Sequence, residues 1–335
     1  MDITPPYLLF LGDAHDDLAV KTASGILDWR PEWVMGQLRL PRCAADLKIP
    51  DLTIEAAAAA GVKTLVIGTV NPGGTLPESW LSVLGEALRA GMDIASGLHT
   101  RLTAFPDLTA QAAETGRRLL EVRHTTERFA TGTGRRRAGK RLLTVGTDCS
   151  VGKKYAALAI EKEMRRRGLD ADFRATGQTG IFIAGRGVAI DAVVADFISG
   201  AVEWLSPDND AAHWDVIEGQ GSLFHPSFAG VSLGLLHGAQ PDAFVVCHEP
   251  TRRTMRNVET PVASISAVIE QTQILGALTN PAIRCVGLAI NTARLDDMAA
   301  STCLAAAEAT YGLPACDPIR TGAGPIVDHI ISLGF

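Results

Sequence analysis

The residues best suited to chemistry lie near the middle of the chain, in the stretch GTDCSVGKKY. The apolar run RLLTV precedes it and a segment of helical spacing follows, which is the setting of a phosphate-binding loop. Glycines let backbone N–H groups converge on an anion, and the helix N-terminus adds partial positive charge. A plain glycine turn between a strand and a helix is the alternative. We expect phosphate to be bound by Gly146, Thr147, Asp148, Cys149, Ser150, Val151, Gly152, Lys153, Lys154 and Tyr155.

Lys154 stands where such loops usually carry Ser or Thr. In a site for a magnesium nucleotide, that hydroxyl ligates the metal. An ammonium group has no lone pair for a metal, so Lys154 adds positive charge without positioning magnesium. The loop therefore predicts a phosphate ligand held by direct contacts, and we expect no bound metal.

Two carboxylates and one histidine are candidates for proton transfer. Asp148 lies within the loop, and Glu218 ends an apolar strand in DVIEGQGS. Either one becomes a base near neutral pH if partial burial raises its pKa. His225, in SLFHPSF, titrates in the useful range. The structural alternatives are a Glu218 that ligates metal or loop hydroxyls and a His225 that is an ordinary loop residue.

Polar side chains after other expected strands are candidates for substrate binding. Ligands collect at the carboxyl ends of strands in open α/β sheets, where RATGQTG, AGRGVAID and HEPTRRTMRN would meet the loop. Each arginine taken alone also fits a structural or solvated role. The candidates are Arg174, Gln178, Thr179, Arg186, Arg252 and Arg253.

Four further polar positions have weaker assignments. Cys149 has no histidine beside it in the sequence, so we interpret it as a small packing residue rather than an acyl-accepting nucleophile. Asn71, His99 and Arg101 follow expected strands in the N-terminal third and are candidates for closing over a substrate.

Strands and helices alternate on both sides of the loop. The N-terminal third has apolar strands at 7–12 and 64–67, with helical spacing over 17–29 and in PESWLSVLGEALRAG. The second half has expected strands at 171–175, 215–218, 243–247 and 286–291, and helices at 153–167, 191–204, 228–238, 262–278, 296–311 and 326–333. This alternation predicts two α/β units, each with a parallel sheet covered on both faces.

A basic stretch rich in glycine and threonine separates the two halves and shows no periodicity. Its charges could contact phosphate, but a solvated connector fits its composition better. We therefore place an N-terminal domain at 1–125, a basic linker at 126–140 and a second, doubly wound domain at 141–335.

Composition narrows the possible partners. The 335 residues are 47% hydrophobic and 20% charged with a net charge of −6, which fits a folded soluble protein and predicts no nucleic-acid partner. The six cysteines form no C-x-x-C pair, the start lacks a basic signal-peptide region, and no segment approaches the ~20 apolar residues of a membrane helix. We expect a reduced, cytoplasmic protein without a membrane partner, acting on small molecules as a homo-oligomer, with the dimer as the preferred state.

Three strings resemble motifs of the dethiobiotin synthetase group of P-loop ATPases. GTDCSVGK is similar to their GTD-x-x-VGKT loop, EGQG to their E-G-x-G string, and LAINT (288–292) to the asparagine-bearing strand end that faces the base. The resemblance implies a P-loop NTPase-like fold for the second half.

The whole chain resembles a family long labelled a domain of unknown function, on the strength of GTDCSVGKKY, IEGQGSLFHPSF and the stretch 174–205. That family pairs a Rossmann-like N-terminal domain with a dethiobiotin-synthetase-like P-loop domain. Members related to DgcN are D-glutamate N-acetyltransferases, which pass acetyl from acetyl-CoA to the D-glutamate amine. The resemblance implies acetyl-CoA as co-substrate, a ligand with phosphates that needs no magnesium.

Three functions remain open on the sequence alone. The first is transfer of acetyl from acetyl-CoA to the α-amine of an acidic amino acid, with D-glutamate preferred. The second is a Mg-ATP-dependent ligase or kinase similar to dethiobiotin synthetase, against which Lys154 argues. The third is a non-catalytic nucleotide-binding regulatory module.

Overall fold

The computed structural model describes residues 2–17, 19–69, 74–124 and 127–335. The chain forms two compact units, each built on its own parallel sheet. The α/β fold predicted from alternating strands and helices is therefore confirmed. Among the described residues, no helix combines the length and the apolar character that crossing a membrane requires.

The first unit has a five-stranded sheet in the order β2-β1-β3-β4-β5, with every pair parallel. Phe10 meets Trp80 edge to face in its core, with ring centroids 5.1 Å apart. The strands are β1 (Tyr7–Gly12), β2 (Val34–Arg39), β3 (Thr64–Ile67), β4 (Asp93–Ser96) and β5 (Leu119–Glu121). The helices are α1 (Lys21–Trp29), α2 (Ile54–Ala59), α3 (Leu81–Arg89), α4 (Pro106–Thr115) and, from later in the chain, α6 (Gln178–Ala184).

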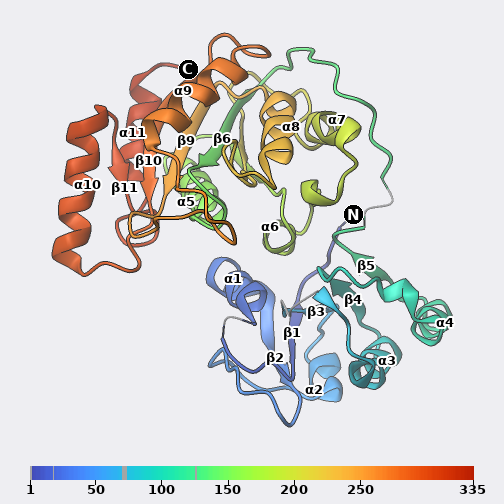
Figure 1. Ribbon diagram of the computed structural model, residues 1–335. Coiled ribbons are helices and arrows are strands. Elements are labelled where there is room, and N and C mark those ends of the chain that lie inside the picture. The colour runs from blue at the N-terminus through green and yellow to red at the C-terminus, as the bar shows by residue number, and fades with distance from the viewer. Residues whose placement is uncertain (1, 18, 70–73, 125–126) are drawn as a thin grey trace. The chain divides into compact units, whose positions relative to one another are not determined.

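Residues 178–192 belong to the first unit, although they follow the phosphate-binding loop in sequence. Helix α6 packs against α1, as Figure 1 shows. The Ile3 N–H donates to the Gly185 carbonyl at 2.9 Å, and Arg123 pairs with Asp191 at 2.6 Å. The chain thus leaves the second unit after Gly177 and returns to it at Val193, a division that differs from the expected boundaries.

The second unit has a six-stranded parallel sheet in the order β11-β10-β9-β6-β8-β7. Figure 1 draws it in green to red. Its strands are β6 (Lys140–Gly146), β7 (Ala171–Arg174), β8 (Trp214–Ile217), β9 (Ala243–His248), β10 (Arg284–Ile290) and β11 (Ala315–Cys316). Its helices are α5 (Lys153–Arg166), α7 (Ile198–Leu205), α8 (Ala229–Ala239), α9 (Ile265–Gly276), α10 (Asp297–Tyr311) and α11 (Gly324–Ser332).

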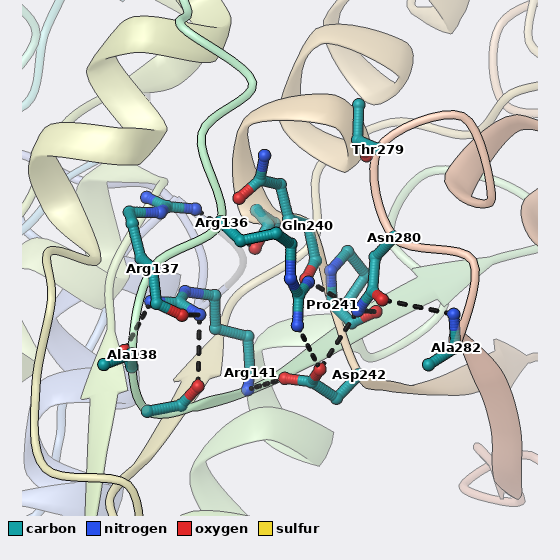
Figure 2. A network of polar contacts seen from close by, with 12 residues as sticks. Arg136, Arg137, Ala138, Arg141, Gln240, Pro241, Asp242, Thr279, Asn280 and Ala282 are labelled. Carbon is teal, nitrogen blue, oxygen red and sulfur yellow. Dashed lines mark hydrogen bonds and ion pairs between the residues drawn. The ribbon is translucent and has the colours of Figure 1, made fainter.

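The stretch expected to be a linker is, from Arg128 onward, part of the second unit. Figure 2 shows how its arginines hold it there. Arg137 is buried and donates to the carbonyls of Ser206 at 2.6 Å and Gly238 at 2.5 Å. Arg136 pairs with Asp242 at 2.9 Å. These contacts tie the segment to the second unit, although residues 131–136 and Ala138 remain exposed to solvent.

The helix expected at 191–204 is shorter than predicted. Two 3₁₀ turns, Ile190–Ala192 and Ala195–Phe197, precede α7. Val194 between them has extended backbone angles, φ −59° and ψ 137°, which interrupt helical hydrogen bonding. The regular helix therefore begins only at Ile198.

Candidate functional site

The phosphate-binding loop connects β6 to α5, as the sequence predicts. Gly152 precedes the helix with φ +107°, a backbone conformation that residues with a Cβ rarely adopt. Gly152, the N-cap residue of α5, has no side chain and makes no side-chain cap hydrogen bond. The loop thus has the strand–glycine–helix geometry on which the prediction of anion binding rests.

Lys153 lies inside this loop. Its Nζ donates to the Asp148 carbonyl at 2.7 Å, and the side chain is buried. Burial lowers the pKa of Lys153 because it penalises the charged ammonium form. A phosphate oxygen placed at this ammonium would restore the solvation that burial removes.

Asp148 is fully buried, and its carboxylate organises the loop. Oδ1 accepts the Cys149 N–H at 2.6 Å. Oδ2 accepts the Arg252 guanidinium at 2.7 Å and the Arg256 N–H at 2.8 Å. With both oxygens engaged and a cation beside it, Asp148 fits a structural role better than that of a base.

Arg252 also completes the loop. Besides Asp148, its guanidinium donates to the carbonyls of Cys149 at 2.5 Å and Ser150 at 3.4 Å. These contacts occupy the guanidinium N–H groups of Arg252 with acceptors from the protein. The geometry therefore favours Arg252 as a loop scaffold over the substrate-binding role that the sequence suggested.

His225 is buried against Phe228, with ring centroids 4.6 Å apart. Its Nε2 lies 3.0 Å from the Arg256 carbonyl, and its Nδ1 accepts the Ser227 N–H at 3.2 Å. These partners assign the neutral ring with the proton on Nε2. Since both nitrogens are engaged, His225 is a weaker candidate for the base than Glu218.

Glu218 follows β8 and is buried. Its Oε2 accepts the N–H groups of Thr176 and Gly177, both at 3.0 Å. The next residue, Gly219, packs so closely that a Cβ there would lie 1.6 Å from the Thr144 carbonyl oxygen. Only glycine fits this position, which explains the E-G pair in the motif.

The carboxyl of Glu218 titrates in the range that a base needs. Burial raises its pKa to about 7, against the opposing effects of the Lys154 charge, the two N–H donors and Lys153. A group with this pKa is divided between acid and base forms at neutral pH, as general base catalysis requires.

Lys154 and Cys149 complete the loop. The Lys154 ammonium lies over the Tyr155 ring, 4.6 Å from its centroid, and its charge acts on Glu218. Burial raises the pKa of the Cys149 thiol, which disfavours the nucleophilic thiolate. The geometry thus agrees with Cys149 as a packing residue.

One group of possible metal donors occurs among the described residues. Asp148, Cys149 and His225 place their ligand atoms within 4.8 Å of one another. Arg252 already balances the Asp148 carboxylate, and His225 directs Nε2 at a carbonyl. A cation would have to displace these contacts and approach a guanidinium, so the cluster is poorly built for one.

A cavity of about 390 Å³ adjoins the loop. Asp317 shapes its far wall, because Oδ1 accepts the N–H groups of Ile319 and Arg320, and Oδ2 accepts the Thr292 N–H. The lining is Val151, Gly152, Tyr155, Ala156, Ala289, Asn291, Ala293, Asp317, Pro318, Ile319 and Arg320. Its mainly apolar lining and the Asn291 amide suit a flat heterocycle, in agreement with the LAINT resemblance.

Other sequence candidates make contacts within their own units. Arg174 is buried in an ion pair with Asp215, at 2.6 Å, and so stabilises the interior of the second unit. Thr179 contacts Thr22 within the first unit, where its neighbours Gln178 and Arg186 also lie. The phosphate-binding loop lies in the second unit.

None of the other candidate residues that the structure describes has a side-chain hydrogen bond or ion pair with the phosphate-binding loop. Arg253 is exposed, and its carbonyl accepts the Val262 N–H at 3.0 Å. His99 offers its carbonyl to His124 at 3.0 Å, and Arg101 is exposed before a 3₁₀ turn. Asn71 lies outside the described residues.

Arg256 lies with Arg252 and Arg253 in HEPTRRTMRN, a segment offered above for substrate binding, whereas Thr176 in RATGQTG was not singled out. Arg256 contacts the loop through its backbone and through a guanidinium bond to Ser150 Oγ at 2.7 Å. Thr176 holds Glu218, and its hydroxyl accepts the Gln220 Nε2 at 3.1 Å. Both residues lie in polar segments that follow a strand, Thr176 two residues after β7 and Arg256 farther along the segment after β9.

Two family models match this chain. A family model described as a domain of unknown function, DUF1611_C P-loop domain, matches residues 128–327, and its companion, the DUF1611_N Rossmann-like domain, matches residues 41–125. The chain belongs to the DUF1611 family. The predicted pairing of a Rossmann-like and a P-loop domain is thereby confirmed.

Two curated relatives of this DUF1611 chain are named D-glutamate N-acetyltransferase. The protein from Tritonibacter scottomollicae is 51% identical over 99% of this chain and 100% of its own length. That from a Pseudoalteromonas species is 50% identical over 98% and 100%. A crystal structure of a DUF1611 family protein from Anabaena variabilis superposes with a TM-score of 0.86 at 32% identity, covering 98% of this chain and 100% of its own. The family recognised in the sequence is confirmed.

Proposed function

We propose that this protein is an N-acetyltransferase that moves the acetyl group of acetyl-CoA to the α-amine of D-glutamate. The observation that carries the proposal is 51% identity, over essentially the whole of both chains, to a relative named for the activity. The acyl donor is the one that the family resemblance implies, and the chemistry of the loop and its cavity supports it.

The loop suits the diphosphate of coenzyme A. Lys153 and Lys154 provide two positive charges, and α5 presents its N-terminus. No hydroxyl follows Lys153 to ligate magnesium, which suits a diphosphate that is bound but never cleaved. The neighbouring cavity would take the adenine, and Asn291 in its lining accepts the Ala293 N–H on Oδ1, which leaves its NH₂ group as a donor for a ring nitrogen.

Glu218 is the proposed base. It takes one proton from the substrate ammonium, and the freed nitrogen bonds to the acetyl carbon. The carbon–sulfur bond then breaks, and the sulfur leaves as the CoA thiol with the second nitrogen proton. Glu218 passes its proton to solvent, which restores the carboxylate for the next cycle.

For Glu218 to act as the base, the pantetheine arm of acetyl-CoA must fold back toward the phosphate-binding loop. The arm is about as long as four extended residues, ~14 Å, whereas Glu218 lies beside the residues that grip the diphosphate. An extended arm would carry the thioester away from Glu218. The kinetics of a Glu218 variant therefore report on where the thioester lies.

A thermal-shift comparison of ligands tests the donor. Acetyl-CoA at a hundred times its Kd should stabilise the protein by about 2.7 kcal/mol in the presence of EDTA. ATP or GTP with magnesium should give a smaller shift. Stabilisation by Mg-ATP alone would replace the proposal with the ligase or kinase function, and stabilisation without turnover of any substrate would favour the regulatory module.

A further inference from the structure

We propose that Arg256 binds the 3′-phosphate of coenzyme A and makes the protein select CoA over dephospho-CoA. The inference rests on the proposed function, because it concerns the acetyl donor. It assigns the donor's specificity to one side chain of the loop that follows β9.

Three contacts fix Arg256 against the phosphate-binding loop. Its N–H donates to Asp148 Oδ2 at 2.8 Å, and its carbonyl accepts His225 Nε2 at 3.0 Å. Its guanidinium donates to Ser150 Oγ at 2.7 Å. Two of these contacts use the backbone, so they survive substitution of the side chain.

The charge of Arg256 is not balanced by the described part of the protein. Arg252, four residues earlier, forms an ion pair with the buried Asp148 carboxylate at 2.7 Å. Among the residues that the structure describes, Arg256 has no carboxylate within ion-pair distance, and its side chain is exposed. One arginine therefore builds the loop, while the other presents a positive charge at its surface.

The position of this charge matches the chemistry of coenzyme A. Ser150, which receives the guanidinium, is followed by Val151 and Gly152, which line the cavity beside the loop. In coenzyme A the ribose joins the adenine to the diphosphate and carries the 3′-phosphate. With adenine in the cavity and diphosphate on the loop, the 3′-phosphate falls at their shared rim. A guanidinium fork there binds phosphate oxygens in pairs.

Arg253 provides a matched control. It lies in the same loop and carries the same charge, and its side chain is exposed. Its carbonyl bonds to Val262, a contact that substitution of the side chain leaves in place. Replacing Arg253 removes one charge from the region without removing the guanidinium at Ser150.

The test is calorimetric binding of CoA and of dephospho-CoA at fixed ionic strength, to the wild type and to the variants R256A, R253A and S150A. The wild type should bind CoA about tenfold to a hundredfold more tightly than dephospho-CoA, the range of a charged hydrogen-bond pair. R256A should lose this preference by weakening CoA alone. R253A and S150A should keep most of the preference.

Each other outcome overturns a specific statement. If R256A and S150A weaken both ligands equally, Arg256 only braces the loop. If R253A loses the preference as fully as R256A does, the discrimination comes from general charge. Equal wild-type affinity for CoA and dephospho-CoA contradicts this inference alone, whereas failure to bind either contradicts the proposed function as well.

Discussion

The backbone N–H of Gly177 donates to Oε2 of Glu218 at 3.0 Å. Gly177 is the last residue before the chain enters the first unit at α6. The Glu218 carboxyl is thus held at one of the three points where the chain passes from one unit to the other. A substitution that keeps the shape of Glu218 but removes its basicity separates its proposed role in proton transfer from its structural role.

Replacing Glu218 with Gln should abolish most of the catalysis. The amide can still accept the Thr176 and Gly177 N–H groups, but it cannot take a proton. We expect kcat to fall by about 10²–10⁴ with little change in KM for acetyl-CoA. Steady-state kinetics across pH provide the measurement.

The pH profile gives an independent check on Glu218. A base must be deprotonated, so wild-type kcat should rise with pH through the pKa of about 7, shifted by bound substrates. The Gln variant should lack this acidic limb. A variant that keeps its kcat but loses affinity for CoA would place the thioester away from Glu218, and the pantetheine arm would then be extended.

Replacing Lys154 with Thr should weaken donor binding. The variant loses an ammonium group at the phosphate site, and we expect KM for acetyl-CoA to rise about tenfold, which corresponds to ~1.4 kcal/mol. Because Lys154 lowers the pKa of Glu218, the acidic limb of kcat should also move to higher pH. A gain of activity with ATP and magnesium would instead reveal a degraded nucleotide site.

Gly219 should tolerate no side chain. A Cβ would lie 1.6 Å from the Thr144 carbonyl oxygen, so Gly219→Ala should lower the free energy of unfolding by at least about 3 kcal/mol. A Cβ at Gly230 in α8 would have no described atom beyond its own helix backbone within 4 Å, and Gly230→Ala should be neutral or stabilising by up to about 1 kcal/mol. Urea unfolding compares the two, and equal effects would remove the packing explanation of the E-G pair.

Removing the Arg252 side chain should destabilise the protein, because it leaves the buried Asp148 carboxylate without its cation. We expect Arg252→Ala to cost about 2 kcal/mol, reduced from a fully buried pair by the partial exposure of Arg252. Arg253→Ala, at an exposed position, should change stability by less than about 0.5 kcal/mol. Thermal unfolding of both variants decides whether Arg252 is a scaffold, since an unchanged Arg252→Ala protein would free it for substrate binding.

Periodicity and glycine placement predict much of this fold. The strand at 64–67 has the predicted bounds, and α10 begins one residue later than expected, at Asp297. Strand β2 was missed because Gly36, Gln37 and Arg39 interrupt its apolar character, although Gln37 is buried. Local pattern carries no information on a polar residue that finds its partners in another segment.

The different contacts of Arg252 and Arg256 could not be predicted for the same reason. Arg252 and Arg256 lie four residues apart in one polar segment, and nothing in that segment says which one meets the Asp148 carboxylate. The packing of 178–192 on the first unit is likewise tertiary: its sequence carries no boundary signal at Gly177. The loop itself was predictable because its spacing depends on backbone geometry.

Turnover of acetyl-CoA with D-glutamate tests the central claim most directly. Purified protein in EDTA should release free CoA thiol only when D-glutamate is present, at a rate well above that with L-glutamate, and mass spectrometry should find N-acetyl-D-glutamate in equal amount. Absence of thiol release from acetyl-CoA, together with consumption of ATP when magnesium is supplied, would contradict the account.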